Sequence, residues 1–371
     1  MDCKIFSFFS GAGFLDLGFE NSGFNIVFAN EICNDFAYCY RYARDKMGIK
    51  PPKYGLANDD VCSYLYDRTK LQILKSRVAS ERRSKSLVGF IGGPPCPDFS
   101  VAGKNKGAEG KHGVLSQIYM DLICEVKPDF FLFENVKGLW KTAKHRVFFY
   151  SIIEQAIKNG YCIIYRLVNS LEYGAPQDRE RILVLGVQKS LLTKESFEAL
   201  QAFDWGRRNG HDAQFIKDMK WPNITSFGSD CPEPKGIDET LTVEYWFRKN
   251  DVDNHPNAHD HFQPKAALKK MLTIGEGDVS RKAYKRLHRW RYSPTVAYGN
   301  NEVHWHPYKQ RRLSVAEALS LQSLPKEFIL PPDLPLSSMF KTIGNGVPYL
   351  LAYSVASAMK KYFEKILGEK S

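Results

Sequence analysis

The chain has 371 residues, of which 52 are Lys or Arg and 41 are Asp or Glu, for a formal charge of +11. With 43% hydrophobic and 25% charged residues, the composition excludes a wholly disordered chain, and the length fits about two domains. No uncharged apolar run reaches about 18 residues and no signal peptide opens the sequence, so we expect no membrane span and no secretion. Eight cysteines without a CxxC pair favour free thiols in a reducing cytosol.

The first half of the chain alternates short apolar, β-rich runs with helical patterns. We predict strands over 4–9, 25–28, 87–91, 130–133, 161–168 and 182–187. Helical patterns lie between them, near 14–22, 33–46, 116–126 and 147–158. Because continuous apolar strands separated by helices are typical of a buried sheet, we predict an α/β fold with a parallel, doubly wound sheet.

Two regions depart from this alternation. Residues 68–85 carry Leu71, Leu74 and Val78 at helical spacing among seven basic residues, which predicts an amphipathic surface helix. After about residue 188 the pattern dissolves, and 204–264 predict an irregular second domain. Helical periodicity returns at 315–323 and 349–367.

The first motif is a glycine turn at the end of the first strand, SFFSGAG over 7–13. It does not match the GxGxxG pattern for a pyrophosphate, whereas an adenosyl cofactor without phosphates would fit. Glu31 ends the second predicted strand, where an acid can accept both ribose hydroxyls. Asp60 is a third acid at a strand end, although a helix-capping carboxylate is the alternative.

The second motif places Cys96 in a loop of paired glycines and prolines directly after an apolar strand. A thiol displayed at that sheet edge can ionise and act as a nucleophile, and a structural thiol is the alternative. Glu134 ends the next strand as a candidate proton donor or hydrogen-bond partner for a bound base, or else as a helix cap.

The third motif is Gln177-Asp178-Arg179-Glu180-Arg181, which enters a predicted strand. Alternation puts Gln177, Arg179 and Arg181 on one face, so two guanidiniums point together. A surface salt-bridge ladder with Asp178 and Glu180 is the alternative interpretation.

In this order, the blocks resemble the DNA (cytosine-5) methyltransferase family, and Arg312-Leu313-Ser314 and Gly344-Asn345-Gly346-Val347-Pro348 complete the series. The departures are Pro97 where the family usually has Gln, Ser7 where Asp is common, and His112 where Arg is common.

The resemblance implies a Rossmann-like, S-adenosylmethionine-dependent methyltransferase domain over 1–187 plus 339–371. A smaller, irregular target-recognition domain with its hinge would span 188–338. The implied reaction moves a methyl group from S-adenosyl-L-methionine to C5 of a cytosine flipped out of a specific duplex, through a Cys96–C6 adduct, with S-adenosyl-L-homocysteine as product. The enzyme would be the modification enzyme of a restriction-modification system.

The resemblance also assigns roles to individual residues. The catalytic residues would be Cys96, Glu134, Arg179 and Arg181. The cofactor would be bound by Phe9, Gly11, Ala12, Gly13, Phe14, Glu31, Ile32, Asp60, Val61, Pro95, Asn345 and Val347. The substrate would be bound by Gln177, Ser100 and Arg312.

The expected partner is double-stranded DNA, bound by a monomer in a prokaryotic cytoplasm, with a restriction endonuclease possible nearby. Residues 265–312 hold twelve basic and three acidic residues, a net charge of +9, which favours phosphate contacts. The 68–85 helix could also touch the DNA backbone, although a solvated face is favoured. Rival interpretations are a tRNA cytosine methyltransferase on the same scaffold and a non-catalytic DNA-binding paralogue.

No metal is expected. His255, His259 and His261, and the pair His304 and His306, lack cysteine partners at zinc spacing, so we interpret them as polar loop residues.

Overall fold

The computed structural model describes residues 2–84, 86–95, 111–208, 210–263, 268–281, 284–296, 298 and 303–368. Its main element is a seven-stranded sheet in the order β3-β2-β1-β4-β5-β8-β6. Strands are added first on one side of β1 and then on the other, so the doubly wound arrangement is confirmed. The bounds are β1 (Cys3–Phe8), β2 (Asn25–Asn30), β3 (Leu56–Ala57), β4 (Leu87–Gly92), β5 (Phe130–Val136), β6 (Tyr161–Asn169) and β8 (Glu180–Gln188).

The prediction of a parallel sheet is wrong at one strand. β8 runs antiparallel to both of its neighbours, β5 and β6, while the other neighbouring pairs are parallel. Only the 3₁₀ turn η2 (Ser170–Tyr173) and the two-residue strand β7 (Gln177–Asp178) lie between β6 and β8. A connection this short, without a crossover helix, returns the chain antiparallel.

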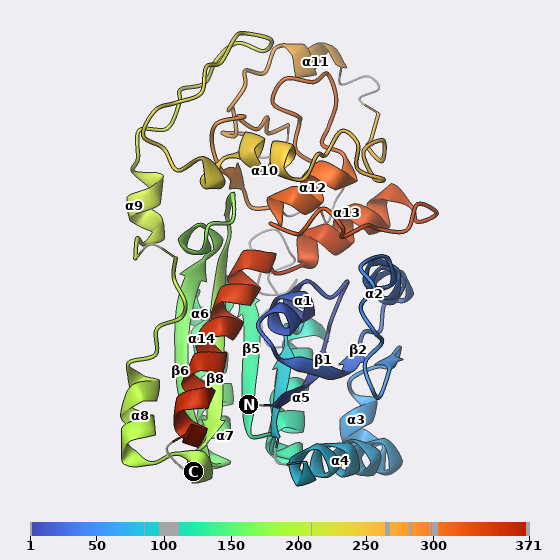
Figure 1. The fold of residues 1–371 in the computed structure, drawn as a ribbon, viewed down its shortest axis with the longest axis vertical. Helices are drawn as coiled ribbons and strands as arrows, with labels where there is room; N and C mark the ends of the chain where they lie inside the picture. Colours follow the sequence, from blue (N-terminus) through green and yellow to red (C-terminus); the bar gives the residue numbers. More distant parts are fainter. Residues whose placement is uncertain are drawn as a thin grey trace.

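Helices cover both faces of the sheet (Figure 1). On one face, Phe6, Phe8 and Phe90 share a core with α3 (Ser63–Tyr66), α4 (Arg68–Arg83), α5 (Lys111–Val126) and α7 (Ala143–Lys158). On the other, Ile5 and Leu132 share a core with α1 (Phe14–Asn21), α8 (Lys194–Gln201) and α14 (Tyr349–Gly368). Apolar side chains that alternate along each strand therefore serve two cores.

The basic helix predicted at 68–85 is confirmed as α4. Leu74 and Val78 are buried, and three of its basic residues form ion pairs with acids of the same domain. In Figure 1, α4 lies at the end of the molecule opposite the irregular domain. The solvated-face interpretation accounts for its charge.

The second region has little regular structure, as predicted. Short helices punctuate it: α9 (Ala213–Lys217), η4 (Glu239–Leu241), α10 (Val243–Lys249) and α11 (Leu268–Leu272). A third core joins it to the sheet domain, because Ala12 and Phe14 pack with α2 (Asn34–Lys46), α10, α12 (Val315–Leu321) and α13 (Leu336–Asn345). The remaining elements are α6 (Gly138–Lys141), η3 (Lys189–Leu191) and β9 (Ser293–Pro294).

The carboxyl end of β1 therefore faces the irregular domain, and the chain returns to the sheet through α13 and α14 (Figure 1). α14 packs along α1. In the part of the chain that the structure describes, no helix is long and apolar enough to cross a bilayer.

Candidate active site

The turn between β1 and α1 depends on its glycines. Gly11 and Gly13 have φ angles of 57° and 86°, in the left-handed region that glycine tolerates. A Cβ on Gly13 would lie 2.8 Å from the Tyr40 ring, whereas a Cβ on Gly11 would meet nothing within 4 Å. The backbone at Gly11 is therefore open to the close approach of a ligand.

Glu31, at the end of β2, faces this turn. Its Oε2 accepts a hydrogen bond from the Gly11 N–H at 2.8 Å, and its Oε1 accepts one from the Cys33 N–H at 2.8 Å. Burial raises the pKa of Glu31, and the backbone N–H groups oppose that rise. Each oxygen keeps a lone pair, so the carboxylate can accept bonds from two adjacent hydroxyls. This geometry fits the predicted ribose contact.

Asp16 supports the turn from beneath, which sequence reasoning missed. Its carboxylate is fully buried and accepts hydrogen bonds from Ser7 Oγ at 2.6 Å and Tyr40 OH at 2.9 Å. Burial raises the pKa of Asp16 to about 6. A second carboxylate at position 7 would repel this one, so a serine donor suits this chain. The available signal was an acid on an otherwise apolar helix face.

Asp60 lies in the loop that follows β3. Its Oδ1 accepts a hydrogen bond from the Cys62 N–H at 2.9 Å, a local turn ahead of α3. The Asn30 side chain donates to the Asp59 carbonyl at 2.8 Å, which ties this loop to the end of β2. Val61 is buried in the core, while Ile32 is 59% exposed. The predicted cofactor residues of β1, β2 and this loop thus gather at one sheet edge.

The second predicted group meets at the ends of β5 and β8. Arg181 Nε lies 2.9 Å from Glu134 Oε1, and both side chains are nearly buried. Burial raises the pKa of Glu134, while the charges of Arg181 and Arg179 pull it down. A carboxyl with a raised pKa beside a guanidinium can present both a proton and a fixed donor to one ligand edge. The helix-cap alternative for Glu134 has no support, because its carboxylate pairs with Arg181.

The segment that leads to Cys96 packs against Glu134. A Cβ on Gly93 would lie 2.5 Å from Glu134 Oε2, so a larger residue there would have to displace the Glu134 carboxylate. The Asn135 side chain donates to the Pro94 carbonyl at 3.4 Å. Pro95 is the last described residue before the gap, and Cys96 and Ser100 lie outside the described residues. Gly93 and Pro94, which precede Cys96 in the chain, thus lie beside Glu134 and Asn135.

Arg179 and Gln177 face the protein interior. Arg179 Nη1 donates to the Val296 carbonyl and Nη2 to the Gly344 carbonyl, each at 2.9 Å. Gln177 is fully buried, with its amide bonded to other protein groups. Both side chains therefore hold together segments that are distant in the chain.

The salt-bridge alternative holds for the acids of this motif. Asp178 pairs with Lys217, and Glu180 pairs with Lys137 and Lys141. The acids therefore pair with surface lysines, while Arg181 turns to Glu134.

The remaining predicted residues lie near the C-terminal return. Arg312 is half-buried just before α12, Asn345 is the exposed last residue of α13, and Val347 is buried against the sheet.

Part of the basic segment 265–312 is structural, which weakens the inference from its charge. Arg286 is fully buried and donates to the backbone carbonyls of Met271, Ile274 and His306. Arg289 and Arg311 pair with buried glutamates. At least three of its twelve basic residues therefore serve the fold of the irregular domain.

Two of the predicted histidines contact other groups of the protein. His255 Nδ1 accepts from the Asn257 N–H, and His306 lies 3.2 Å from Glu317. Burial lowers the pKa of both rings, so the neutral form is favoured. This geometry agrees with polar loop residues.

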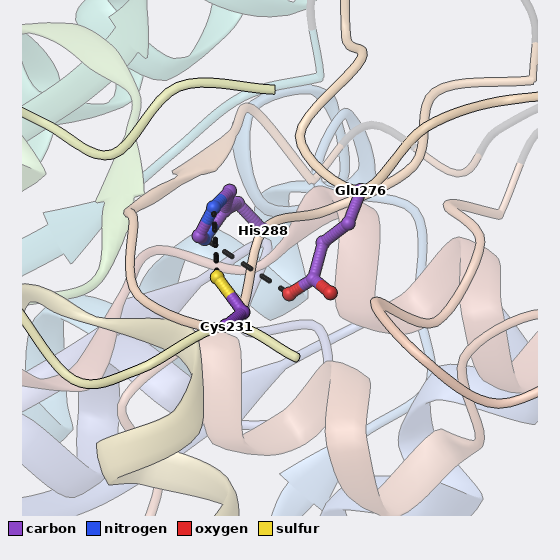
Figure 2. Close-up of side chains that lie close together, drawn as sticks. All are labelled: Cys231, Glu276 and His288. Atoms are coloured by element: carbon purple, nitrogen blue, oxygen red, sulfur yellow. Dashed lines mark hydrogen bonds and ion pairs between the residues drawn. The ribbon is translucent and has the colours of Figure 1, made fainter. Parts of the chain in front are cut away.

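A different cluster brings Cys231, Glu276 and His288 together in the irregular domain (Figure 2). Cys231 Sγ lies 3.6 Å from His288 Nε2, and Glu276 Oε1 lies 4.0 Å from His288 Nδ1. Cys231 is distant in the chain from Glu276 and His288, so their spacing gave no metal-site pattern. They fit a metal poorly, because Arg289 donates to both oxygens of Glu276 at 2.8 and 2.7 Å.

We therefore expect Glu276 to stabilise the fold without a metal. Glu276→Gln is expected to lower the free energy of unfolding by about 3 kcal/mol, because Arg289 loses its charged partner in a buried site. Urea denaturation measures this, with Glu233→Gln, in an exposed pair with Arg248, as the near-neutral control. Prior EDTA treatment should leave the unfolding curve unchanged, and zinc-reversible destabilisation would contradict this assignment.

Solved structures share this fold. A protein encoded within an Escherichia coli prophage aligns with a TM-score of 0.66 and 22% identity, covering 98% of this chain and 99% of that one. The Entamoeba histolytica methyltransferase EhMeth aligns with a TM-score of 0.58 and 14% identity, over 99% of both chains. The sheet order and these likenesses confirm the doubly wound α/β fold.

Sequence relatives then give the family. The model of the C-5 cytosine-specific DNA methylases matches residues 3–361. The chain is 55% identical over 360 residues to the Type II methyltransferase M.NmeDI of Neisseria meningitidis serogroup C, covering 97% of this chain and 84% of that protein. It is 30% identical over 379 residues to M.MthTI of Methanothermobacter thermautotrophicus, covering 99% and 100%. The chain belongs to the C-5 cytosine-specific DNA methylase family and is a DNA cytosine-5 methyltransferase of the Type II restriction-modification kind.

Proposed function

We propose that the protein methylates C5 of one cytosine, flipped out of a specific duplex sequence, through a covalent bond between Cys96 and C6. The observation that carries this proposal is the nearly buried Glu134–Arg181 pair at 2.9 Å. Cytosine presents N3 and O2 side by side on one edge, so an adjacent acid and guanidinium can hold both. Because the base edge is hidden in a duplex, the pair becomes useful only once the base leaves the stack.

C5 of cytosine is a poor nucleophile, and residues of this chain would make it more nucleophilic. The Cys96 thiolate adds to C6 while Glu134 gives its proton to N3, which leaves an electron-rich enamine at C5. S-adenosylmethionine supplies an electrophilic methyl group for C5. Loss of the C5 proton to solvent then expels Cys96, and the N3 proton returns to Glu134. Arg181 holds O2 throughout.

The chain's own residues fit the cofactor. Gly11 leaves open space beside the turn, and Glu31 keeps free lone pairs for the ribose hydroxyls. Asp60 and Val61 would contact the adenine, and Asn345 and Val347 would close the site from the C-terminal return. We further propose that residues 188–338 read the target DNA and that a monomer works beside a separately encoded endonuclease.

The test is methyl transfer from labelled S-adenosylmethionine to duplex DNA or to tRNA. We expect label in duplex DNA alone, and bisulfite sequencing should place it at one cytosine of a fixed sequence. Binding to DNA should weaken with salt by a log–log slope of roughly −0.9 per contacted phosphate. Label in tRNA, or in neither substrate, would overturn the proposal.

A further inference from the structure

Two buried glutamines form a continuous hydrogen-bonded bridge behind the candidate active site. Gln177 Oε1 accepts from the Val296 N–H at 2.9 Å, and its Nε2 donates to Gln322 Oε1 at 3.1 Å. Gln322 Nε2 then donates to the carbonyls of Ile343 at 2.5 Å and Gly346 at 3.4 Å. Both glutamines are fully buried. The amide bridge, Gln177 with Gln322, thus joins three segments that are distant in the chain.

Each end of the bridge reaches a part of the candidate active site. Val296 follows β9 in the irregular domain, and its carbonyl also binds Arg179. Ile343 and Gly346 belong to the turn at 343–347, which carries Asn345 and Val347. Arg179 binds the same turn at the Gly344 carbonyl, so the two segments are tied from both sides.

The turn also touches the glycine loop of β1. A Cβ on Gly346 would lie 2.0 Å from the Phe14 ring, so the turn packs directly on the residue after Gly13. The backbone carbonyl of Gln322 accepts from the Tyr349 N–H at 2.9 Å, which holds the start of α14. A displacement of Gln322 would therefore move the turn at 343–347. Through the contact of this turn with Phe14, it would also move the glycine loop on the other side of the proposed cofactor site.

The direction of the bridge is fixed by the Val296 N–H. The Val296 N–H donates to Gln177 Oε1, so this atom must be the amide oxygen. The Gln177 NH₂ group therefore donates to Gln322 Oε1 and to the Leu321 carbonyl, the latter at 3.1 Å. The Gln322 NH₂ must then face the carbonyls of the turn. A buried donor or acceptor left unpaired costs about 1–3 kcal/mol, so a change at one end is felt along the bridge.

We propose that Gln177 and Gln322 are positioning residues that couple the irregular domain near Val296 to the cofactor-side turn at 343–347. Through the bridge, DNA held by the irregular domain strengthens cofactor binding, and the cofactor strengthens DNA binding by the same factor. This rests on the proposed function for the identity of the two ligands. It gives Gln177 a role other than direct contact with substrate.

The test is calorimetric binding of S-adenosylhomocysteine to the full-length protein, which requires no methylation. Gln322→Glu should weaken this binding roughly five- to tenfold, since a carboxylate cannot donate to the turn. Gln177→Glu should weaken it too, although Gln177 itself does not touch the turn. The double variant should lose less than the product of the two single losses, because both break one bridge.

Controls separate positioning from general damage. Gln201→Glu makes the same change at an exposed site on α8 and should bind normally. If the glutamate variants unfold, the neutral, similarly sized Gln177→Met and Gln322→Met replace them in the same assay. The measurement is then repeated with the duplex sequence that bisulfite sequencing identifies. Added duplex should raise the S-adenosylhomocysteine affinity of the wild type, and the factor of this increase should fall toward one in each bridge variant.

Wild-type cofactor affinity in a folded Gln177 variant, or independent effects of the two substitutions, would overturn the proposal. A protein that binds S-adenosylhomocysteine but methylates no DNA would refute the proposed function instead. The cofactor-binding arm would still decide whether the bridge acts on the turn.

Discussion

Cys96→Ser is expected to abolish methyl transfer while leaving cofactor binding intact. A serine hydroxyl is hardly ionised at neutral pH, whereas a cysteine thiol ionises far more readily, so attack at C6 fails in the variant. The rate of label transfer to DNA should fall by at least roughly 10³-fold. Single-turnover incorporation measures this, with excess enzyme and saturating S-adenosylmethionine.

The matched control is Cys162→Ser, a half-buried cysteine of β6, which should keep the wild-type rate. Calorimetry with S-adenosylhomocysteine should give the wild-type affinity for Cys96→Ser. Substantial turnover by this variant would remove Cys96 from the mechanism and leave the thiol a structural role.

Glu134→Gln is expected to reduce turnover by about 10²–10⁴-fold, the usual share of a positioned general acid. The amide can still meet Arg181, but it has no proton to pass to N3. The substitution leaves the Arg181 charge without its counter-charge, so urea denaturation should first establish that the variant is folded. The single-turnover rate measures the loss, with Glu154→Gln, exposed on α7, as the control.

The pH profile adds a second readout for Glu134. Burial raises the pKa of this carboxyl, so the proton donor persists to higher pH than in a free glutamate and is lost as the pH rises through the folded pKa. The wild-type rate should fall along that limb, and Glu134→Gln should lack it. A wild-type rate in the variant would show that the acid only anchors Arg181.

Much of the fold follows from local patterns. The apolar runs and the helical periodicities predicted the main strands and helices, and α4 was found where Leu74 and Val78 indicated it. The direction of one strand was not predicted correctly. β8 runs antiparallel because no crossover helix joins β6 to β8, and the residue pattern of a strand gives no information about its connection.

For the site, the glycine turn and the strand-end acids pointed to residues that the structure gathers at one edge. The Glu134–Arg181 pair was not predicted as a pair, because the two residues meet only through the pairing of β5 with β8. The buried hydrogen bonds of Gln177 were not predicted, since its partners lie just after β9 and at the end of α12.

The sequence by itself determined the order of the elements, the residues at the strand ends and, through the ordered motifs, the family. Those features depend on residues close together in the chain, and the spacing of such residues is visible in the sequence itself. Only the tertiary structure decided which charges are free to meet DNA, because Arg286, Arg289 and Arg311 are bound to carbonyls and carboxylates within the irregular domain. Burial and partner choice are set by packing between distant segments, and that packing turns a basic stretch of sequence partly into structural scaffold.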